Sequence, residues 1–204
     1  ASTGRIYGLK INRWIDERRD PVLATKAAIT YLKHLYGIFG DWELAMAAYN
    51  TGEGRVIRTI NRAKKKGKKH NFWALRLPPE TRGYVPAIMA AAVIYKNPKR
   101  YGFGHVRLLS PMDETKVNLT VAFSLEEVAK RSKMSFSTLR DKNPALFLGV
   151  PPMTQTSYSF YVPQNNRQKL MASLKQNPNP SKKWGHSYNA LLGSSNRATR
   201  VLEK

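Results

Sequence analysis

The sequence predicts a mainly α-helical chain that continues into a small α/β module. Residues 20–97 carry apolar side chains at helical spacing, in segments separated by glycine and proline. After about residue 110 the pattern changes to two alternating, strand-like segments with two short helical segments between them. A chain of 204 residues is long enough to bury one core or two small ones.

The helical part can be divided at its capping residues. Asp20-Pro21 predicts a helix start, because aspartate caps a helix and proline fits its first position. We expect that helix to end at Gly37 and Gly40, and a short helix capped by Asp41 to stop near Thr51-Gly52. Two further helices are expected over residues 55–65 and from about residue 80 to residue 97, with Pro86 starting or kinking the second.

The second part reads as strand, helix, helix, strand. Residues 117–121 and 158–163 alternate in polarity as strands do. Ser124, with Glu127 three positions later, predicts a capping box before the first helix. Ser135 or Ser137 opens the second helix, and Asn143-Pro144 stops it. Residues 177–204 are expected to be a linker and a tail without regular structure, because they show no clear periodicity.

The composition limits the classes of function. Lys and Arg number 35 against 13 Asp and Glu, a net charge of +22 that attracts nucleic acid, anionic lipid or the carboxylates of peptidoglycan peptide stems. Composition does not choose among the three. The chain has no cysteine, which excludes disulfides and thiol chemistry. Its four histidines lack the spacing of metal ligands, so no metal and no cofactor are expected.

The segment Ala47-Ala48-Tyr49-Asn50 precedes a Gly-x-Gly turn formed by Gly52 and Gly54. Small alanines allow a helix to pack closely, and glycines allow the backbone to approach a ligand. A phenol and an amide would then face a cleft, and these neutral groups suit the hydroxyl and N-acetyl groups of a sugar. The alternative is a helix end with a packed tyrosine and no ligand.

Four motifs resemble, in the correct order, those of lysozyme-like lytic transglycosylases, enzymes that cut the glycan strands of bacterial peptidoglycan. They are STGRIYGL (2–9), WIDERRDP (14–21), AAYNTGEGRV (47–56), and FW (72–73) followed by PPETRGYVP (78–86). The resemblance implies that residues 1–109 form part of a lysozyme-like α-lobe. Residues 110–176 resemble a LysM peptidoglycan-binding module in degenerate form, because the usual SGDT is replaced by Val121-Ala122-Phe123-Ser124.

The resemblance also implies a reaction: cleavage of the β-1,4 bond between N-acetylmuramic acid and N-acetylglucosamine, with formation of a 1,6-anhydro ring. Tyr49 would orient and stabilise the reacting centre, and the substrate-binding residues would be Asn50, Tyr84, Phe72 and Trp73. In that family the catalytic glutamate lies upstream of the segment where this sequence begins. The chain alone is therefore expected to be inactive, and Glu53 is read as a turn residue paired with Arg55.

The expected partners are peptidoglycan glycan strands, together with the missing N-terminal segment or another polypeptide that completes the fold. The expected location is the periplasm, in association with the outer membrane, and nucleic acid is not expected as a partner. Two alternatives stay open: a non-catalytic peptidoglycan-binding or scaffold piece, and a nucleic-acid-binding module that only the charge supports.

Overall fold

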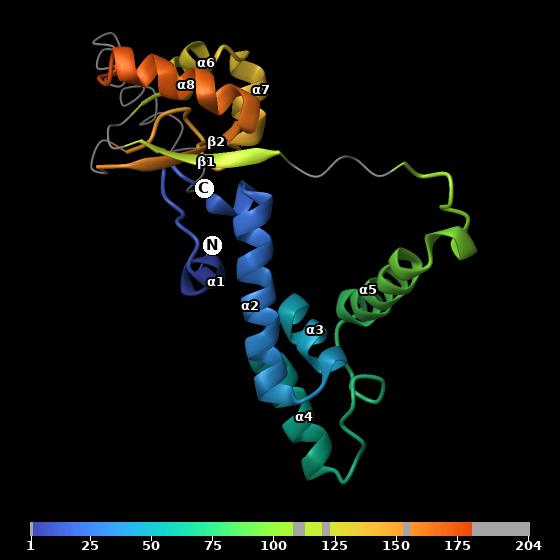
Figure 1. The fold of residues 1–204 in the computed structure, drawn as a ribbon. Helices are drawn as coiled ribbons and strands as arrows, with labels where there is room; N and C mark the ends of the chain where they lie inside the picture. Colours follow the sequence, from blue (N-terminus) through green and yellow to red (C-terminus); the bar gives the residue numbers. More distant parts are fainter. Residues whose placement is uncertain (1, 108–112, 120–122, 153–155, 181–204) are drawn as a thin grey trace. The chain divides into compact units, whose positions relative to one another are not determined.

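The computed structural model describes residues 2–107, 113–119, 123–152 and 156–180, and these residues are mostly helical with one two-stranded sheet (Figure 1). The prediction of a mainly α chain is thus confirmed. None of the helices in the described part is both long and apolar enough to cross a membrane. The elements in chain order are α1 (Ser2–Ile6), η1 (Glu17–Arg19), α2 (Pro21–Phe39), α3 (Trp42–Thr51), α4 (Glu53–Lys65), α5 (Pro79–Lys96), η2 (Pro98–Tyr101), β1 (Glu114–Leu119), α6 (Leu125–Ser132), α7 (Phe136–Lys142), β2 (Tyr158–Pro163) and α8 (Gln164–Gln176).

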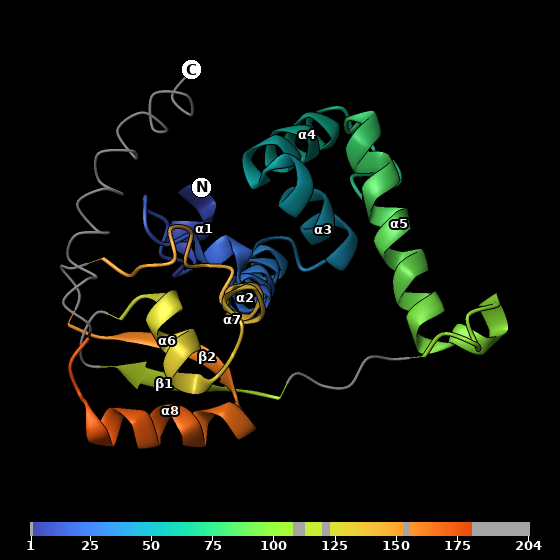
Figure 2. The same cartoon turned by 90° about the horizontal axis from the view of Figure 1, so that it is seen from above.

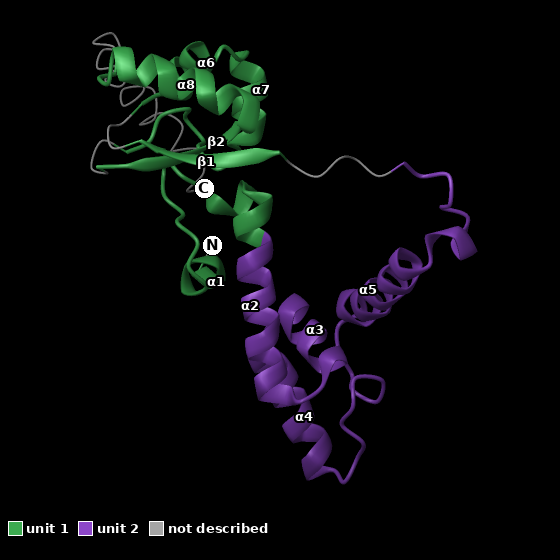
Figure 3. Cartoon of the chain, viewed as in Figure 1, with its two compact units in different colours: residues 1–24, 111–204 green, residues 25–110 purple. Residues whose placement is uncertain are grey.

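The chain divides into two compact units (Figure 3). Residues 25–110 form one unit, and residues 1–24 belong with residues 111–204 in the other. Each unit has its own cluster of buried apolar side chains. The division by contacts therefore falls inside α2, whereas the domain boundaries predicted from family motifs lie after residues 109 and 176. Those boundaries stay a prediction.

In the unit of residues 25–110, α3 packs against both α4 and α5 (Figure 2). The two caps predicted for α2 and α3 are confirmed: Asp20, which lies before this unit, accepts from the Val22 N–H at 2.9 Å, and Asp41 accepts from the Leu44 N–H at 2.8 Å. Helix α2 continues through Gly37 and stops only at Gly40, whose φ of 64° is left-handed. A glycine inside a helix costs only about 1 kcal/mol, so it need not end one. Pro86 lies inside α5, which begins earlier, at Pro79.

In the other unit β1 and β2 pair antiparallel, with Val117 opposite Phe160, and Figure 1 shows α6, α7 and α8 on the same side of this ribbon. The predicted order of strand, helix, helix, strand is confirmed. So are two caps: Ser124 accepts from the Glu127 N–H and Ser135 from the Thr138 N–H, both at 3.1 Å. The end of the predicted first strand, residues 120–121, lies outside the described residues.

Helix α8 was not predicted. It begins directly after β2, with Pro163 as a cap that has no side-chain hydrogen bond, and its first residues are polar. Leu170 is its one buried residue. The helix packs mainly on α6, so tertiary contact rather than a local signal determines it.

The segment before α2 packs on the module of residues 113–176. Ile15 forms an isolated β-bridge with Leu146, and Trp14 O accepts from the Phe147 N–H at 3.1 Å. The Asp16 N–H donates to Ala145 O at 2.8 Å. Trp14 and Ile15 are 5% and 1% exposed and belong to the core of this unit.

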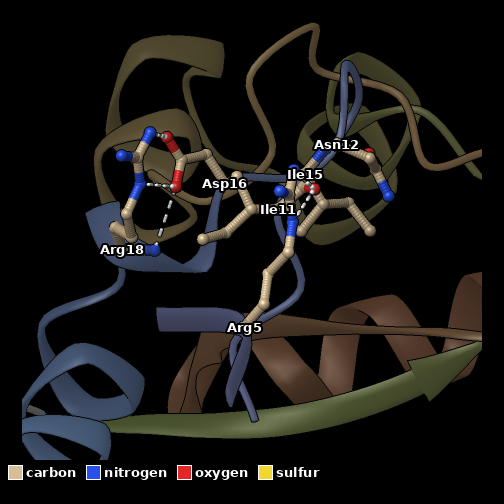
Figure 4. A network of polar contacts seen from close by, with 6 residues as sticks. All are labelled: Arg5, Ile11, Asn12, Ile15, Asp16 and Arg18. Atoms are coloured by element: carbon tan, nitrogen blue, oxygen red, sulfur yellow. Dashed lines mark hydrogen bonds and ion pairs between the residues drawn. The ribbon is translucent and has the colours of Figure 1, made fainter. Parts of the chain in front are cut away.

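Polar contacts hold this segment in shape (Figure 4). Asn12 Oδ1 accepts from the backbone N–H groups of Trp14 and Ile15, at 2.8 and 2.9 Å. Arg18 donates to Asp16 through Nε at 2.9 Å and through Nη2 at 2.7 Å. The Arg5 guanidinium donates to Ile11 O at 2.9 Å. The segment is therefore an ordered part of its unit.

Candidate functional site

The end of α3 presents Tyr49 and Asn50. Ala47 and Ala48 are fully buried in the core, so the side of α3 that they occupy is packed, whereas Tyr49 is exposed and Asn50 is half-buried. Gly52 ends α3 and begins α4 with φ 89°, a conformation that residues with a Cβ rarely adopt. The alanines and glycines of residues 47–54 thus form a sharp junction between α3 and α4.

Tyr49 lies in a cluster of three tyrosines. Its ring centroid is 5.4 Å from that of Tyr31 on α2, and Tyr49 itself is 36% exposed. Burial raises the pKa of the Tyr84 phenol, and the neighbouring Tyr49 raises it further. The Tyr84 hydroxyl therefore stays protonated at neutral pH and can donate a hydrogen bond.

Glu53 is held within this cluster. The Tyr31 hydroxyl donates to Glu53 Oε2 at 2.8 Å. Among the described residues Glu53 forms no ion pair with Arg55, so the expected pairing was wrong. The difference arises because Glu53 opens α4 at the junction, where the phenol of α2 lies within its reach.

Asn50 joins the end of α3 to the start of α5. Its Oδ1 accepts from the Thr81 hydroxyl at 2.7 Å, and its Nδ2 donates to Glu80 Oε1 at 3.3 Å. Thr81 is 1% exposed. A primary amide has two donor hydrogens and two acceptor lone pairs, so Asn50 retains one of each for a ligand.

The two aromatic residues predicted to bind sugar have different environments. Phe72 is 3% exposed and belongs to the core of its unit, whereas Trp73 is 63% exposed. Their rings meet edge to face, with centroids 5.0 Å apart. Phe72 thus packs against Trp73 from the core, and of the two only Trp73 is exposed enough to stack on a ligand.

The structure brings together Tyr49, Asn50 and Tyr84, all of which the sequence predicted. It adds Tyr31 and Thr81, for which the sequence pattern indicated only a position in a helix. Their partners lie 22 and 31 positions away in the chain, so no local pattern could have revealed them. Within the described residues no group of His, Asp and Glu is arranged to hold a metal ion.

Comparison with known proteins gives consistent matches. Residues 1–72 match the family model "Transglycosylase SLT domain". The chain is 41% identical over 178 residues to membrane-bound lytic murein transglycosylase D of Escherichia coli (strain K12), and the match covers 85% of this chain and 38% of that protein. The same figures hold for the protein of that name from Escherichia coli O6:H1.

A shorter match is to a putative tributyltin chloride resistance protein of Alteromonas sp. (strain M-1), 41% identical over 63 residues, 30% of each chain. The chain thus spans well under half of the length of these relatives. Tyr49, Asn50 and Glu53 lie within the residues that match the family model, and Trp73 and Tyr84 lie beyond them. Residues 1–72 are thus similar to the transglycosylase SLT domain, and most of the chain is similar to part of the membrane-bound lytic murein transglycosylases D.

Proposed function

We propose that the protein carrying this chain is a peptidoglycan lytic transglycosylase, which cleaves the N-acetylmuramic acid–N-acetylglucosamine β-1,4 bond and leaves a 1,6-anhydro end. The observation that carries the proposal is the junction of α3 and α4. There Tyr31, Tyr49 and Asn50, all in the part of the chain that matches the transglycosylase family, stand beside Tyr84, which lies beyond that part.

The residues of this site have distinct roles in the proposal. Tyr49 orients and stabilises the reacting sugar, Asn50 binds its N-acetyl or hydroxyl groups, and Tyr84 donates from a neutral phenol. Trp73 stacks on a sugar ring, held by the buried Phe72. These side chains are neutral, so they suit a neutral sugar better than an ion.

The proton transfers are assigned to a glutamate of the kind that the family resemblance implies, outside these residues. It protonates the glycosidic oxygen, and the substrate's own N-acetyl group stabilises the positive centre, so that no second carboxylate is needed. The same glutamate then removes the proton of the C6 hydroxyl as the ring closes. Glu53 takes no part, since it is engaged by Tyr31.

Three finer assignments accompany this function. We propose that residues 1–109 form part of a lysozyme-like α-lobe, which the packing of α3 against α4 and α5 supports. Strands β1 and β2 pair antiparallel, and α6 and α7 lie between them in the sequence. This order supports a LysM-like module over residues 110–176. The membrane-bound relatives support a location in the cell envelope, for which we propose the periplasm and the outer membrane.

The test uses the whole protein that carries this chain and purified peptidoglycan. The products are separated and analysed by mass spectrometry. Anhydro-muropeptides are expected, and each such end is lighter by one water than a hydrolysed end. Products with only reducing ends would assign the protein to hydrolysis, and bound but uncut peptidoglycan would assign it to a binding or scaffold role.

A further inference from the structure

The unit of residues 25–110 contains an open pocket of about 490 Å³ that the proposed reaction does not use. One wall is a face of α4, and the other is the segment that leads into α5. The residues that line it are Arg55, Arg58, Thr59, Arg62, Arg76, Leu77 and Pro78.

Four guanidinium groups line this arginine pocket. Arg55, Arg58 and Arg62 are three and four positions apart, a spacing that places them on one face of α4, and Arg76 comes from the opposite wall. Each carries a full positive charge, because arginine is not deprotonated in proteins. The residues that line the pocket include no carboxylate.

None of the four arginines forms an ion pair with any side chain in the described part of the chain. The two carboxylates nearest to the arginines in sequence already have partners: Glu53 accepts from Tyr31 and Glu80 accepts from Asn50. Gly54 leaves room for Arg58: a Cβ at Gly54 would lie 3.3 Å from Arg58 Nη1. Four like charges around one pocket repel each other, and an anion bound between them would relieve that repulsion.

The position of the pocket suggests which anion it binds. Helix α4 begins at Glu53, just after Asn50 and Gly52, and Leu77-Pro78 precede the Glu80 and Thr81 side chains that bond to Asn50. Each wall of the arginine pocket is therefore continuous in the chain with a segment that carries the Asn50 site: α4 follows the end of α3, and residues 76–78 precede the start of α5. A glycan strand at Asn50 carries peptide stems whose free carboxylates are ligands that a guanidinium binds with two parallel hydrogen bonds.

We propose that the arginine pocket between α4 and residues 76–78 binds the carboxylates of peptide stems on the glycan strand that Asn50 engages. This inference rests on the proposed function, because it takes the same substrate. It gives the site a preference for glycan that still bears peptides. It also means that part of the net charge of +22 serves to bind the substrate.

The test compares two kinds of purified glycan, both immobilised on beads: sacculi with intact stems, and strands from which an amidase has removed the stems. Binding of the whole protein to the beads is compared with binding of the double variant Arg58→Gln/Arg62→Gln. The matched control is Lys68→Gln/Lys69→Gln, which removes the same charge from exposed residues outside the pocket. We expect the pocket variant to bind intact sacculi about tenfold more weakly, equal to about 1.4 kcal/mol, and to bind stripped strands like the unchanged protein.

Several results would overturn the inference. Binding that is equal in the pocket variant and the unchanged protein, or equally weakened on both glycans, would exclude a role in stem recognition. An equal loss in the lysine control would leave only general charge attraction. Inorganic polyphosphate that displaces the protein from sacculi far better than a free stem peptide would assign the pocket to phosphate.

The same experiment separates this inference from the proposed function. If neither glycan is bound by the unchanged protein, both fail. If stripped strands are bound and anhydro ends are produced while the arginine variant behaves like the unchanged protein, only the arginine pocket loses its proposed ligand.

Discussion

At the scale of single residues, Tyr49 is the position on which the proposed chemistry depends most. Its ring is fixed against Tyr31, so changing Tyr49 to Phe removes the hydroxyl and keeps the ring contact. In the whole protein we expect turnover to fall by about 10²-fold while binding changes little, if the hydroxyl assists proton transfer. The measurements are the rate of anhydro-muropeptide release and co-sedimentation with sacculi.

The control for Tyr49→Phe is Tyr36→Phe, on α2. Tyr36 is similarly exposed, at 39%, and its ring stacks on Trp42 with centroids 4.4 Å apart. This variant should release product at the normal rate. An unchanged rate in Tyr49→Phe as well would reduce Tyr49 to a packing residue.

Glu53 provides a second prediction at this scale. Its carboxylate accepts a hydrogen bond from Tyr31, and the amide oxygen of glutamine can accept the same bond. We therefore expect Glu53→Gln to keep activity within a few-fold of the unchanged protein, in the same assay. Complete loss of activity would mean that the carboxylate transfers a proton, contrary to the role assigned here.

Part of this site could be predicted from the sequence. Tyr49 and Asn50 were found because a local pattern of alanine and glycine surrounds them. Tyr31 and Thr81 were not found, because their roles depend on contacts between helices that are distant in the chain. Phe72 was grouped with Trp73 because neighbouring aromatic residues look alike in a sequence, although only the second is exposed.

At the scale of elements, the helices that begin with a capping side chain were predicted well. Asp41, Ser124 and Ser135 each bond to the backbone as the sequence indicated. Helix α8 begins without such a bond and was missed. Local hydrogen bonds can be read from neighbouring residues, whereas a helix stabilised mainly by packing on α6 cannot.

Asn143 shows how one side chain ends a helix and fixes a strand. It is 3% exposed, and its amide accepts from the Tyr161 N–H at 2.8 Å and donates to Tyr161 O at 2.9 Å. Asn143→Ala would leave these backbone groups of β2 unpaired, at a cost of at least about 2 kcal/mol. Urea unfolding measures this loss of stability, and hydrogen exchange in residues 158–163 shows whether β2 is affected. The control is Asn118→Ala, at an exposed position of β1, and equal stability of the two variants would contradict the prediction.

The Asp16–Arg18 pair predicts a dependence on pH. The hydrogen bond from the Arg18 side chain lowers the pKa of Asp16 below its ordinary value, against a smaller opposing effect of burial. Because the folded-state pKa is the lower one, the stabilisation is complete above the unfolded pKa of about 3.9 and is lost as the pH falls through the folded value.

The corresponding measurement is the melting temperature of Asp16→Asn. We expect the variant to melt below the unchanged protein at pH 7, and the difference between them to shrink at acidic pH as Asp16 becomes protonated in the folded state as well. Asp141→Asn is the control. Asp141 is 74% exposed and lies 3.9 Å from Arg140, so that variant should match the unchanged protein at both pH values. A deficit in Asp16→Asn that persists at acidic pH would exclude the pair as its cause.

At the scale of the whole molecule, the contacts join the start of the chain to the module of residues 113–176. This arrangement was not anticipated, because family motifs group residues 1–24 with the helices that follow them. Trp14 and Ile15 lie in the core of the module, together with Leu146, Phe160 and Leu170. Part of the sequence that matches the transglycosylase family is thus built into the fold of the unit that contains residues 111–204.

This arrangement predicts that a change at Ile15 destabilises residues far from it in the sequence. Ile15 is 1% exposed, so Ile15→Ala should cost about 2–5 kcal/mol through lost burial and a cavity. Hydrogen exchange of the full chain should then speed up in β1 and β2. Exchange in α3 and α4, which belong to the other core, should change much less.

The control is Ile29→Ala, on α2, where the side chain is 48% exposed and its loss removes little burial. This variant should leave exchange in β1 and β2 unchanged. If exchange in β1 and β2 were as slow in Ile15→Ala as in the unchanged protein, the fold of the module would not depend on the segment before α2. Faster exchange confined to β1, β2 and the helices packed on them would instead mean that residues 10–20 and the module unfold as one cooperative unit.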